Sequence, residues 1–226
     1  MKRPITLPRG NIAALFIDLQ EEHRHDARYL VEGFDAVLVN AARLQRAARA
    51  NGAPLYHFAY IVDLAEGGAR PYHPVMPDGR SAFSDKSDPL TAVCPEVGPE
   101  GAEPLIVKSE ATAFRTGLGA ELHRHGVEWL VVSGVWTEAC VDATVKDAIG
   151  HGFRVLLVKD ACGSGTGAMH QTGILNLANR LYGGAVASTE TACRLLAGEA
   201  AEVWVVDGAV PLRYSLGDVT SLYNSL

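Results

Sequence analysis

The stretch "EWLVVSGVWTEACVDATVKDAIGHGFRVLLVKDA", residues 128–161, decides the fold. Residues 128–135 and 153–161 are mostly apolar runs with the length of buried strands. Between them, residues 138–152 have helical character and end in glycine, which is a common helix stop. A helix that connects two buried strands in this way is typical of a parallel sheet. The stretch therefore predicts an α/β fold.

The same alternation of strands and helices extends over most of the chain. Apolar runs predict further strands at 12–17, 54–60, 104–108 and 185–188. Helical spacing and helix stops predict further helices at 34–52, 116–126, 167–183 and 189–198. Many Gly, Pro, Asp and Ser residues predict a long loop region at 61–103. The repeated unit predicts a three-layer α/β/α architecture, with helices on both faces of a parallel sheet.

The chain has 226 residues, of which 48% are hydrophobic, and this suits one large α/β domain. We expect this domain to span residues 1–198. Residues 199–226 follow the last strand–helix unit and are apolar enough to pack against a surface. Two interpretations of this tail stay open, because it can cover its own domain as a strand and arm or reach onto a neighbouring subunit.

The composition disfavours some classes of function. The net charge is −6 and no Lys/Arg-rich run is present, which argues against nucleic acid or an anionic membrane as the main partner. The four cysteines are widely spaced, and they predict a reducing, cytoplasmic setting rather than a disulfide framework. The apolar run 12–17 is too short for a signal peptide, and no stretch approaches the length of a membrane span.

Three reactive side chains follow the predicted strands at their carboxyl ends, where open parallel sheets bind ligands. Asp18 follows the first strand, Lys108 ends the third, and Cys140 lies just past the fourth at a helix start. Each has an ordinary explanation as a cap, a solvated strand end or core filling. Their occurrence at the same edge of one sheet favours a shared site.

These three residue types suit nucleophilic attack on a carbonyl group. The thiolate is the reactive form of cysteine, and the partial positive charge of a helix start favours it at Cys140. Asp18 can take the thiol proton, and Lys108 keeps that carboxylate ionised. Backbone N–H groups at the helix start can hold the oxyanion. Cys162 also follows a strand but has no obvious base and is interpreted as structural, and neither Cys94 nor Cys193 lies at a helix start.

Three stretches carry a family resemblance: "AALFIDLQ" (13–20), "IVKSEATAF" (106–114) and "SGVWTEACVDATVKDAIGHGFRVLLVKDAC" (133–162). Through them the chain resembles the isochorismatase-like cysteine hydrolase superfamily from about residue 11 to 198. Its amidohydrolase branch, with N-carbamoylsarcosine and ureidoacrylate amidohydrolases, is the most similar.

The resemblance implies a catalytic triad of Asp18, Lys108 and Cys140. It also implies a six-stranded parallel sheet in the order 3-2-1-4-5-6 and a cis peptide just before Thr137. The backbone N–H groups of Trp136 and Cys140 would then form the oxyanion hole. In this order the third strand lies at the sheet edge, so Lys108 must reach inward to meet Asp18.

Departures from the family pattern narrow the range of reactions and substrates that the resemblance implies. Nicotinamidases of this superfamily carry an Asp-x-His-x-x-His metal site after the second strand, whereas "HFAYIVDLAEGG" (57–68) lacks that spacing. We therefore expect no metal and no other cofactor, and we disfavour nicotinamide as substrate. Isochorismatases commonly lack the nucleophilic cysteine, so Cys140 favours the amidase branch.

Substrate-binding residues are harder to assign from the sequence. In "EEHRHDARY" (21–29), Arg24 or His25 is either part of a solvated turn or a partner for a substrate carboxylate. Phe114 and Trp136 are expected as apolar pocket walls, and Gln20 is expected to orient the substrate amide. Thr137 is expected to lie at the oxyanion hole.

The sequence thus predicts a metal-independent cysteine amidohydrolase that cleaves a C–N bond of a small amide or carbamoyl (ureido) compound through a thioester or carbamoyl-enzyme. Two alternatives stay open. One is isochorismatase-type hydrolysis of a vinyl ether with Asp18 as the acid. The other is a non-catalytic small-molecule-binding or redox-sensing protein on the same fold. A homo-oligomer, a dimer or a tetramer, is also expected from the resemblance.

Overall fold

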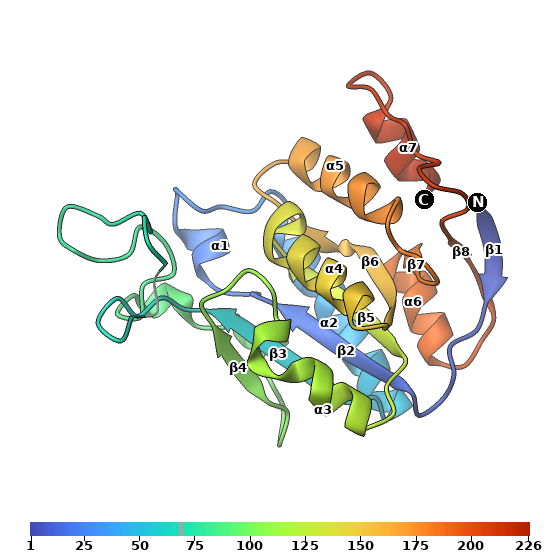
Figure 1. Cartoon of the computed structure of the whole chain (residues 1–226), viewed down its shortest axis with the longest axis horizontal. Coiled ribbons are helices and arrows are strands. Elements are labelled where there is room, and N and C mark those ends of the chain that lie inside the picture. Colours follow the sequence, from blue (N-terminus) through green and yellow to red (C-terminus); the bar gives the residue numbers. More distant parts are fainter. Residues whose placement is uncertain (68–69) are drawn as a thin grey trace.

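A computed structural model of the chain describes residues 1–67 and 70–226. Its centre is one eight-stranded sheet with the strand order β1-β8-β7-β6-β5-β2-β3-β4 (Figure 1). The six strands from β7 to β4 in that order are joined by parallel pairing. They are β2 (Ile12–Ile17), β3 (Leu55–Tyr60), β4 (Leu105–Lys108), β5 (Trp129–Val135), β6 (Arg154–Gly163) and β7 (Ala185–Ala187). Antiparallel pairing adds β8 (Ala201–Trp204) and β1 (Lys2–Ile5) beside β7.

The prediction of a six-stranded, all-parallel sheet was wrong in the number of strands. The six predicted strands are present in the predicted order, and β8 and β1 extend the sheet beyond β7. β1 has the sequence KRPI and is mostly exposed, so it carries no apolar run that would mark a strand. Its partner β8 lies near the other end of the chain, with Lys2 opposite Trp204. Such a pairing leaves no local signal in the sequence.

The tail packs on its own chain in this structure. Beyond β8, the short helix α7 (Val219–Ser225) lies beside α5 (Gly167–Ala178) (Figure 1). The side-chain amide of Asn179 holds the tail through two hydrogen bonds of 2.9 Å, one to the carbonyl and one from the N–H of Leu212. β8 pairs with β1 and β7 and is part of the sheet. The domain boundary proposed at residue 198 stays a prediction.

Helices cover both faces of the sheet, as predicted (Figure 1). On one face lie α2 (Phe34–Asn51) and α6 (Thr189–Leu196). On the other lie α3 (Leu118–Arg124), α4 (Asp142–Gly150) and α5. All six residues of β2 are buried because alternate side chains enter the two cores, with Phe16 on the α2 side and Leu15 on the α4 side. This explains why a central strand is a continuous apolar run.

The predicted helices are present with shifted ends. α2 follows its prediction closely and ends at Gly52, whose φ of 80° is the left-handed conformation that glycine tolerates. The helix predicted at 138–152 is split into a π-helical turn, η4 (Thr137–Val141), and α4. The predicted loop region contains two short 3₁₀ turns, η1 (Pro89–Thr91) and η2 (Pro95–Val97). A third such turn, η3 (Phe114–Thr116), precedes α3.

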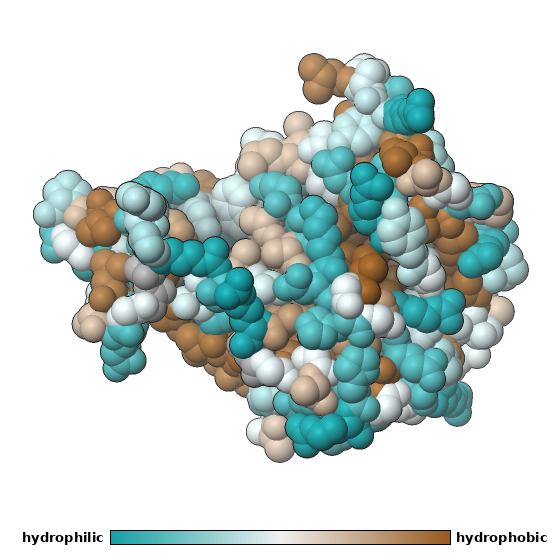
Figure 2. Space-filling view, viewed as in Figure 1, coloured by the Kyte–Doolittle hydropathy of each residue, from teal (hydrophilic) through white to brown (hydrophobic). Residues whose placement is uncertain are grey.

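The long loop and the short helix α1 (Glu22–His25) stand at the carboxyl ends of β2, β3 and β4 (Figure 1). Hydrophilic side chains are spread over the face formed by α3, α4 and α5, as Figure 2 shows. Within the described ranges, no helix combines the length and the apolar character needed to cross a bilayer.

Candidate active site

Asp18 comes directly after the central strand β2 and is almost fully buried. Its φ of 52° lies in the left-handed region, which aspartate enters more readily than most residues. The backbone N–H of Asp18 donates to the carbonyl of Phe58 on β3 at 3.1 Å. The change of chain direction at the strand end therefore turns the Asp18 carboxyl group over the edge of the sheet.

Lys108, the last residue of β4, reaches Asp18 from the sheet edge. Its Nζ donates to Asp18 Oδ2 at 2.7 Å, and both side chains are about 97% buried or more. The ammonium also donates to the carbonyls of Glu110 and Ala111 at 3.1 and 3.2 Å. The ammonium also lies 4.8 Å from the ring centre of Tyr60, which pairs with Lys108 and belongs to β3, the strand between β2 and β4. The long side chain thus spans the intervening strand, and all three ammonium protons have acceptors.

Cys140 lies in η4, directly after β5, and is half-buried. The cis peptide of this segment joins Val135 to Trp136, so its predicted place before Thr137 was wrong by one bond. Trp136 is extended, and η4 begins after it. The side chains of Cys140 and Asp18 both line one pocket.

The charges at this site differ from the expectation for Cys140. Burial, followed by the negative charge of Asp18, raises the pKa of the thiol, and Lys108 only partly opposes this. Burial therefore opposes the thiolate form that the helix start is expected to favour. Burial also raises the pKa of Asp18, against the attraction of Lys108 and a contact with the thiol. Among the described residues, Asp18 Oδ1 has no hydrogen-bond partner, so it can accept a proton.

The pocket has a volume of about 180 Å³ and is suited to a small molecule. Its walls come from the ends of β2, β3 and β5, from α1 and η4, and from the long loop. It is lined by Asp18, Glu22, His23, Tyr29, Tyr60, Phe83, Ser84, Ala111, Val135, Trp136, Ala139 and Cys140.

Trp136 is the one predicted substrate-binding side chain that the described structure brings to this pocket. Gln20 is fully buried, and its amide nitrogen donates to the carbonyls of Tyr60 and Thr91 at 3.0 and 2.8 Å. Its amide oxygen accepts from the N–H of Tyr60 at 2.8 Å. Gln20 therefore holds the loop against β3 and has no group left to orient a substrate amide.

Phe114 and Thr137 lie behind the pocket. Phe114 stacks on His151, with 4.9 Å between ring centres, inside the core under α3 and α4. The Thr137 hydroxyl donates to the carbonyl of Gly163 at 2.9 Å and lies 2.8 Å from Nδ1 of His170. The expectation of Phe114 as a pocket wall was therefore wrong, whereas the place of Thr137 at the oxyanion hole stays a prediction.

Arg24 and His25 also point away from the pocket. The Arg24 guanidinium pairs with Glu21 at 2.6 Å and with Glu96 at 2.9 Å, and the exposed His25 lies 3.3 Å from Glu21. These hydrogen bonds to Arg24 hold the pKa of Glu21 and of Glu96 below the usual range. The alternative of a charged, solvated turn fits the structure, and neither residue lines the pocket.

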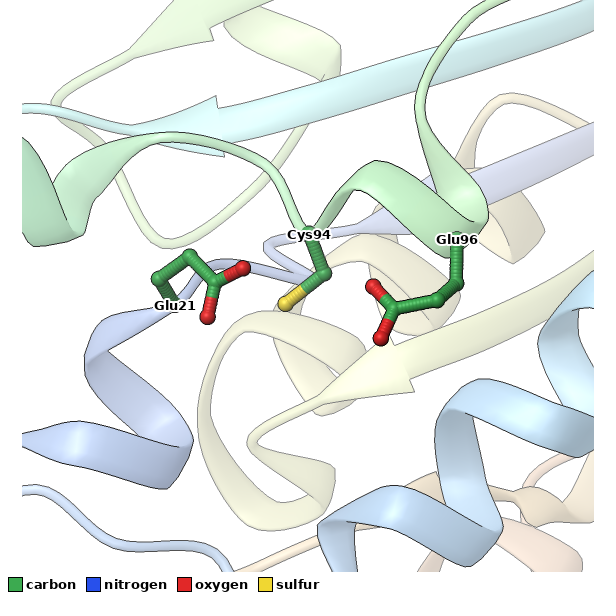
Figure 3. Close-up of side chains that lie close together, drawn as sticks. All are labelled: Glu21, Cys94 and Glu96. Atoms are coloured by element: carbon green, nitrogen blue, oxygen red, sulfur yellow. The ribbon is translucent and has the colours of Figure 1, made fainter.

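Figure 3 shows Glu21, Cys94 and Glu96 side by side, with the sulfur between the two carboxylates. The spacing of their ligand atoms is compatible with a metal ion. However, Arg24 already pairs with both carboxylates, and burial raises the pKa of the Cys94 thiol to about 12. The chain neutralises this cluster with its own guanidinium, so we do not assign a metal site there.

Sequence reasoning missed most of the pocket wall, above all Glu22, His23, Tyr29, Phe83 and Ser84. The Glu22 oxygens accept from the hydroxyl and the N–H of Ser84 at 2.6 and 3.1 Å. Burial raises the pKa of Glu22 to about 7 and lowers that of His23 to about 4. The segment 21–29 was singled out for its charges, but the side chains that enter the pocket are neighbours of the ones chosen.

Comparisons with known proteins agree with this fold. Residues 13–191 match the isochorismatase domain. Maleamate amidohydrolase from Pseudomonas putida is 31% identical over 180 residues, which is 77% of this chain and 82% of the relative. A ureidoacrylate amidohydrolase from Yersinia enterocolitica is 24% identical over 218 residues, 87% of this chain and 94% of the relative.

A solved isochorismatase family protein from Desulfovibrio vulgaris has a similar structure, with a TM-score of 0.74 at 25% identity. The match covers 83% of this chain and 98% of that one. The chain belongs to the isochorismatase family, and its predicted resemblance is confirmed. Within that family, its relatives include proteins named as amidohydrolases of small C–N compounds.

Proposed function

We propose that this protein is a cysteine amidohydrolase that cleaves the C–N bond of a small amide or carbamoyl compound. The observation that carries the proposal is that Cys140 and Asp18 line the same small pocket, with Lys108 bonded to one oxygen of the Asp18 carboxylate. The amidohydrolase names of several relatives support the same reaction class. The mechanism uses groups of this chain alone, so we also propose that it needs no metal or other cofactor.

The proposed reaction begins with transfer of the Cys140 thiol proton to Asp18. The sulfur attacks the carbonyl carbon, and the carbonyl oxygen becomes an oxyanion, held by the backbone N–H groups of Trp136 and Cys140. The C–N bond then breaks, and Asp18 returns the proton to the leaving nitrogen. This leaves a thioester, or a carbamoyl-enzyme for a ureido substrate.

Hydrolysis of the acyl-enzyme completes the cycle. Asp18 takes a proton from water, the resulting hydroxide attacks the acyl carbon, and the acid leaves as the Cys140 sulfur recovers its proton from Asp18. The raised pKa values of Asp18 and Cys140 favour proton transfer between the two groups in both half-reactions. The thiol and the carboxylate exchange one proton instead of both being ionised at rest. Lys108 offsets the negative charge that appears at each stage.

A panel assay tests the proposal. Ammonia or amine release is measured with small amides, ureido acids and carbamoyl amino acids for the wild type and for Cys140→Ala. We expect Cys140→Ala to lower kcat by at least about 10³-fold, as for other catalytic units that act together. Cys193→Ala is the matched control, because that half-buried thiol lies on α6, outside the pocket. Full turnover by Cys140→Ala would exclude the mechanism.

One observation favours a second candidate, the hydrolysis of a vinyl ether. The raised pKa of Asp18 suits a carboxylic acid that donates a proton. This reaction predicts that Asp18→Asn abolishes turnover of isochorismate while Cys140→Ala is nearly silent. The same raised thiol pKa of Cys140 disfavours a redox-sensing role, which depends on a reactive thiolate.

Two expectations on the setting of the protein remain proposals. All four cysteines are free, which supports a cytoplasmic location. Exposed apolar side chains support assembly into a dimer or tetramer; they include Val39 of α2 and Leu105 and Val107 of β4. Light scattering of the purified protein measures the number of subunits.

A further inference from the structure

We propose that the pocket selects amides whose other end is positively charged, such as an amino-amide, and disfavours substrates with a carboxylate. This inference rests on the proposed function for the chemistry at Cys140, but it concerns the rest of the pocket. Three features carry it: the signs of the charges that line the pocket, an aromatic wall, and a buried carboxylate without a cation.

The charges that line the pocket are acidic. Asp18 and Glu22 both contribute carboxylates, and no Lys or Arg is among the described residues of the lining. Lys108 is committed to Asp18 and to two carbonyl groups. A substrate carboxylate would therefore lose its water without gaining a partner of opposite charge, which is costly.

The basic residues nearest to the pocket are already paired. Arg24 bonds Glu21 and Glu96 on the outer side of α1. Among the other described basic residues, Arg28 pairs with Asp26 at 2.6 Å and Arg70 pairs with Glu110. His23 adds no positive charge, because burial lowers its pKa to about 4. Its Nδ1 lies 3.3 Å from Trp136 Nε1 and 3.3 Å from the carbonyl of Tyr29.

One side of the pocket is a continuous aromatic wall. The ring of Tyr29 lies 5.1 Å from that of Trp136 and 5.8 Å from that of Phe83, between ring centres. Tyr60 continues the wall, with its ring 5.9 Å from Phe83. Aromatic faces attract ammonium groups, and several rings around one site form the usual cage for such cations.

Glu22 supplies the anionic side of this cage. Its side chain is 4% exposed and lines the pocket, and Ser84 donates to both of its oxygens. No described Lys, Arg or His lies within ion-pair distance of it, although buried carboxylates are rarely left without a partner. Ser84 has a φ of 49°, so a strained loop residue holds the carboxylate in place. A substrate ammonium is the missing partner.

Binding of such a cation should be coupled to the loss of a proton. The pKa of Glu22 is about 7, raised by burial, with hydrogen bonds from Ser84 opposing it and the charges of Asp18 and Asp26 adding to it. The other groups that sense its charge are Arg28 and Tyr29. A bound ammonium favours the ionised carboxylate, so its affinity should fall by up to about tenfold for each pH unit below 7.

The test separates charge from size with three matched amides. These are β-alaninamide with an ammonium, butanamide with a methyl group, and succinamate with a carboxylate, all on the same two-carbon chain. Calorimetry on Cys140→Ala measures binding without turnover. We expect β-alaninamide to bind at least about tenfold more tightly than butanamide at pH 8, with proton release, and succinamate to bind most weakly.

Glu22→Gln in the same Cys140→Ala background tests the assigned residue. It should bring the affinity ratio of β-alaninamide to butanamide close to one and abolish the pH dependence of that ratio. Glu21→Gln is the matched control, since this neighbouring side chain turns to Arg24, and it should leave the ratio unchanged. Thermal melts of each variant check the fold.

The outcomes also separate this inference from the proposed function. The inference is overturned if succinamate binds best, if none of the three amides binds, or if Glu22→Gln leaves the ratio unchanged. Ammonia release by the wild-type protein is a separate measurement. Rapid hydrolysis of succinamate that depends on Cys140 would contradict the cation preference but would support the proposed amidohydrolase function. A clear ammonium preference without hydrolysis of any amide would support the cation preference and contradict the proposed amidohydrolase function.

Discussion

Replacement of Lys108 by Met tests how much the site depends on one buried charge pair. Met has nearly the length of the Lys stem but leaves the carboxylate of Asp18 without its cation. At 2.7 Å the attraction between the two charges is about 6 kcal/mol for an effective dielectric constant of about 20. Part of that offsets the cost of burying both groups. Removal of one partner of a buried pair commonly costs about 3–5 kcal/mol, and we expect that loss at pH 7.

The loss should depend on pH with a definite sign. Burial already raises the pKa of Asp18 above its unfolded value, and removal of Lys108 raises it further. The folded variant then binds a proton that the unfolded chain has released, so its stability is retained at acid pH and declines as the pH rises above about 4. The deficit relative to wild type should be small near pH 4 and largest at neutral pH and above.

Urea unfolding followed by circular dichroism from pH 4 to 8 measures this deficit. The double variant Asp18→Asn Lys108→Met is the control, because it removes both charges and leaves no unpaired carboxylate. It should be more stable at pH 7 than Lys108→Met alone. A deficit below about 1 kcal/mol at pH 7, or one that does not change with pH, would refute the energetic role given to the pair.

Two further predictions concern the thiol and the backbone. Because burial, and after it the charge of Asp18, raises the pKa of Cys140, iodoacetamide should label Cys140 slowly at pH 7 and faster as the pH rises. Asp18→Asn removes the second cause and should accelerate labelling at pH 7. Peptide mass spectrometry measures the rate, with buried Cys94 as internal reference, and slower labelling of Asp18→Asn would refute the prediction. Gly134→Ala should lower the free energy of unfolding by more than about 4 kcal/mol, since a Cβ there would lie 2.1 Å from the Ile17 carbonyl between two central strands. Gly150→Ala, where nothing lies within 4 Å, is its control in the same urea titration and should change stability little.

The sequence was informative where a structural signal is local. The central strands are continuous apolar runs because both of their faces are covered, and the residues at their carboxyl ends must meet at one edge. That reasoning predicts that Asp18, Lys108 and Cys140 lie close together. The charge state of Cys140 could not be read in the same way, because it depends on burial and on the distance to Asp18.

Predictions failed where the direction of a side chain depends on a distant partner. Arg24 is drawn outward by Glu96, which is 72 residues away, and Gln20 is held by Thr91, 71 residues away. Neither partner is marked by any motif. The aromatic and acidic pocket wall was missed for the same reason, since Phe83 and Ser84 come from a loop without periodicity. Loop residues reach a site through tertiary contacts that sequence spacing does not encode.

The position of Lys108 on β4 ties the site to the most weakly held strand of the parallel set. β4 pairs on one side only, has four residues, and exposes Leu105 and Val107. Edge segments of this kind open and close locally far more often than the whole molecule unfolds. We expect each such opening of β4 to withdraw the Lys108 ammonium group from Asp18 while β2 and β5 stay paired. Activity should therefore be lost on heating at a temperature below the melting temperature of the core. Amide hydrogen exchange along β4 should detect the local opening of this strand.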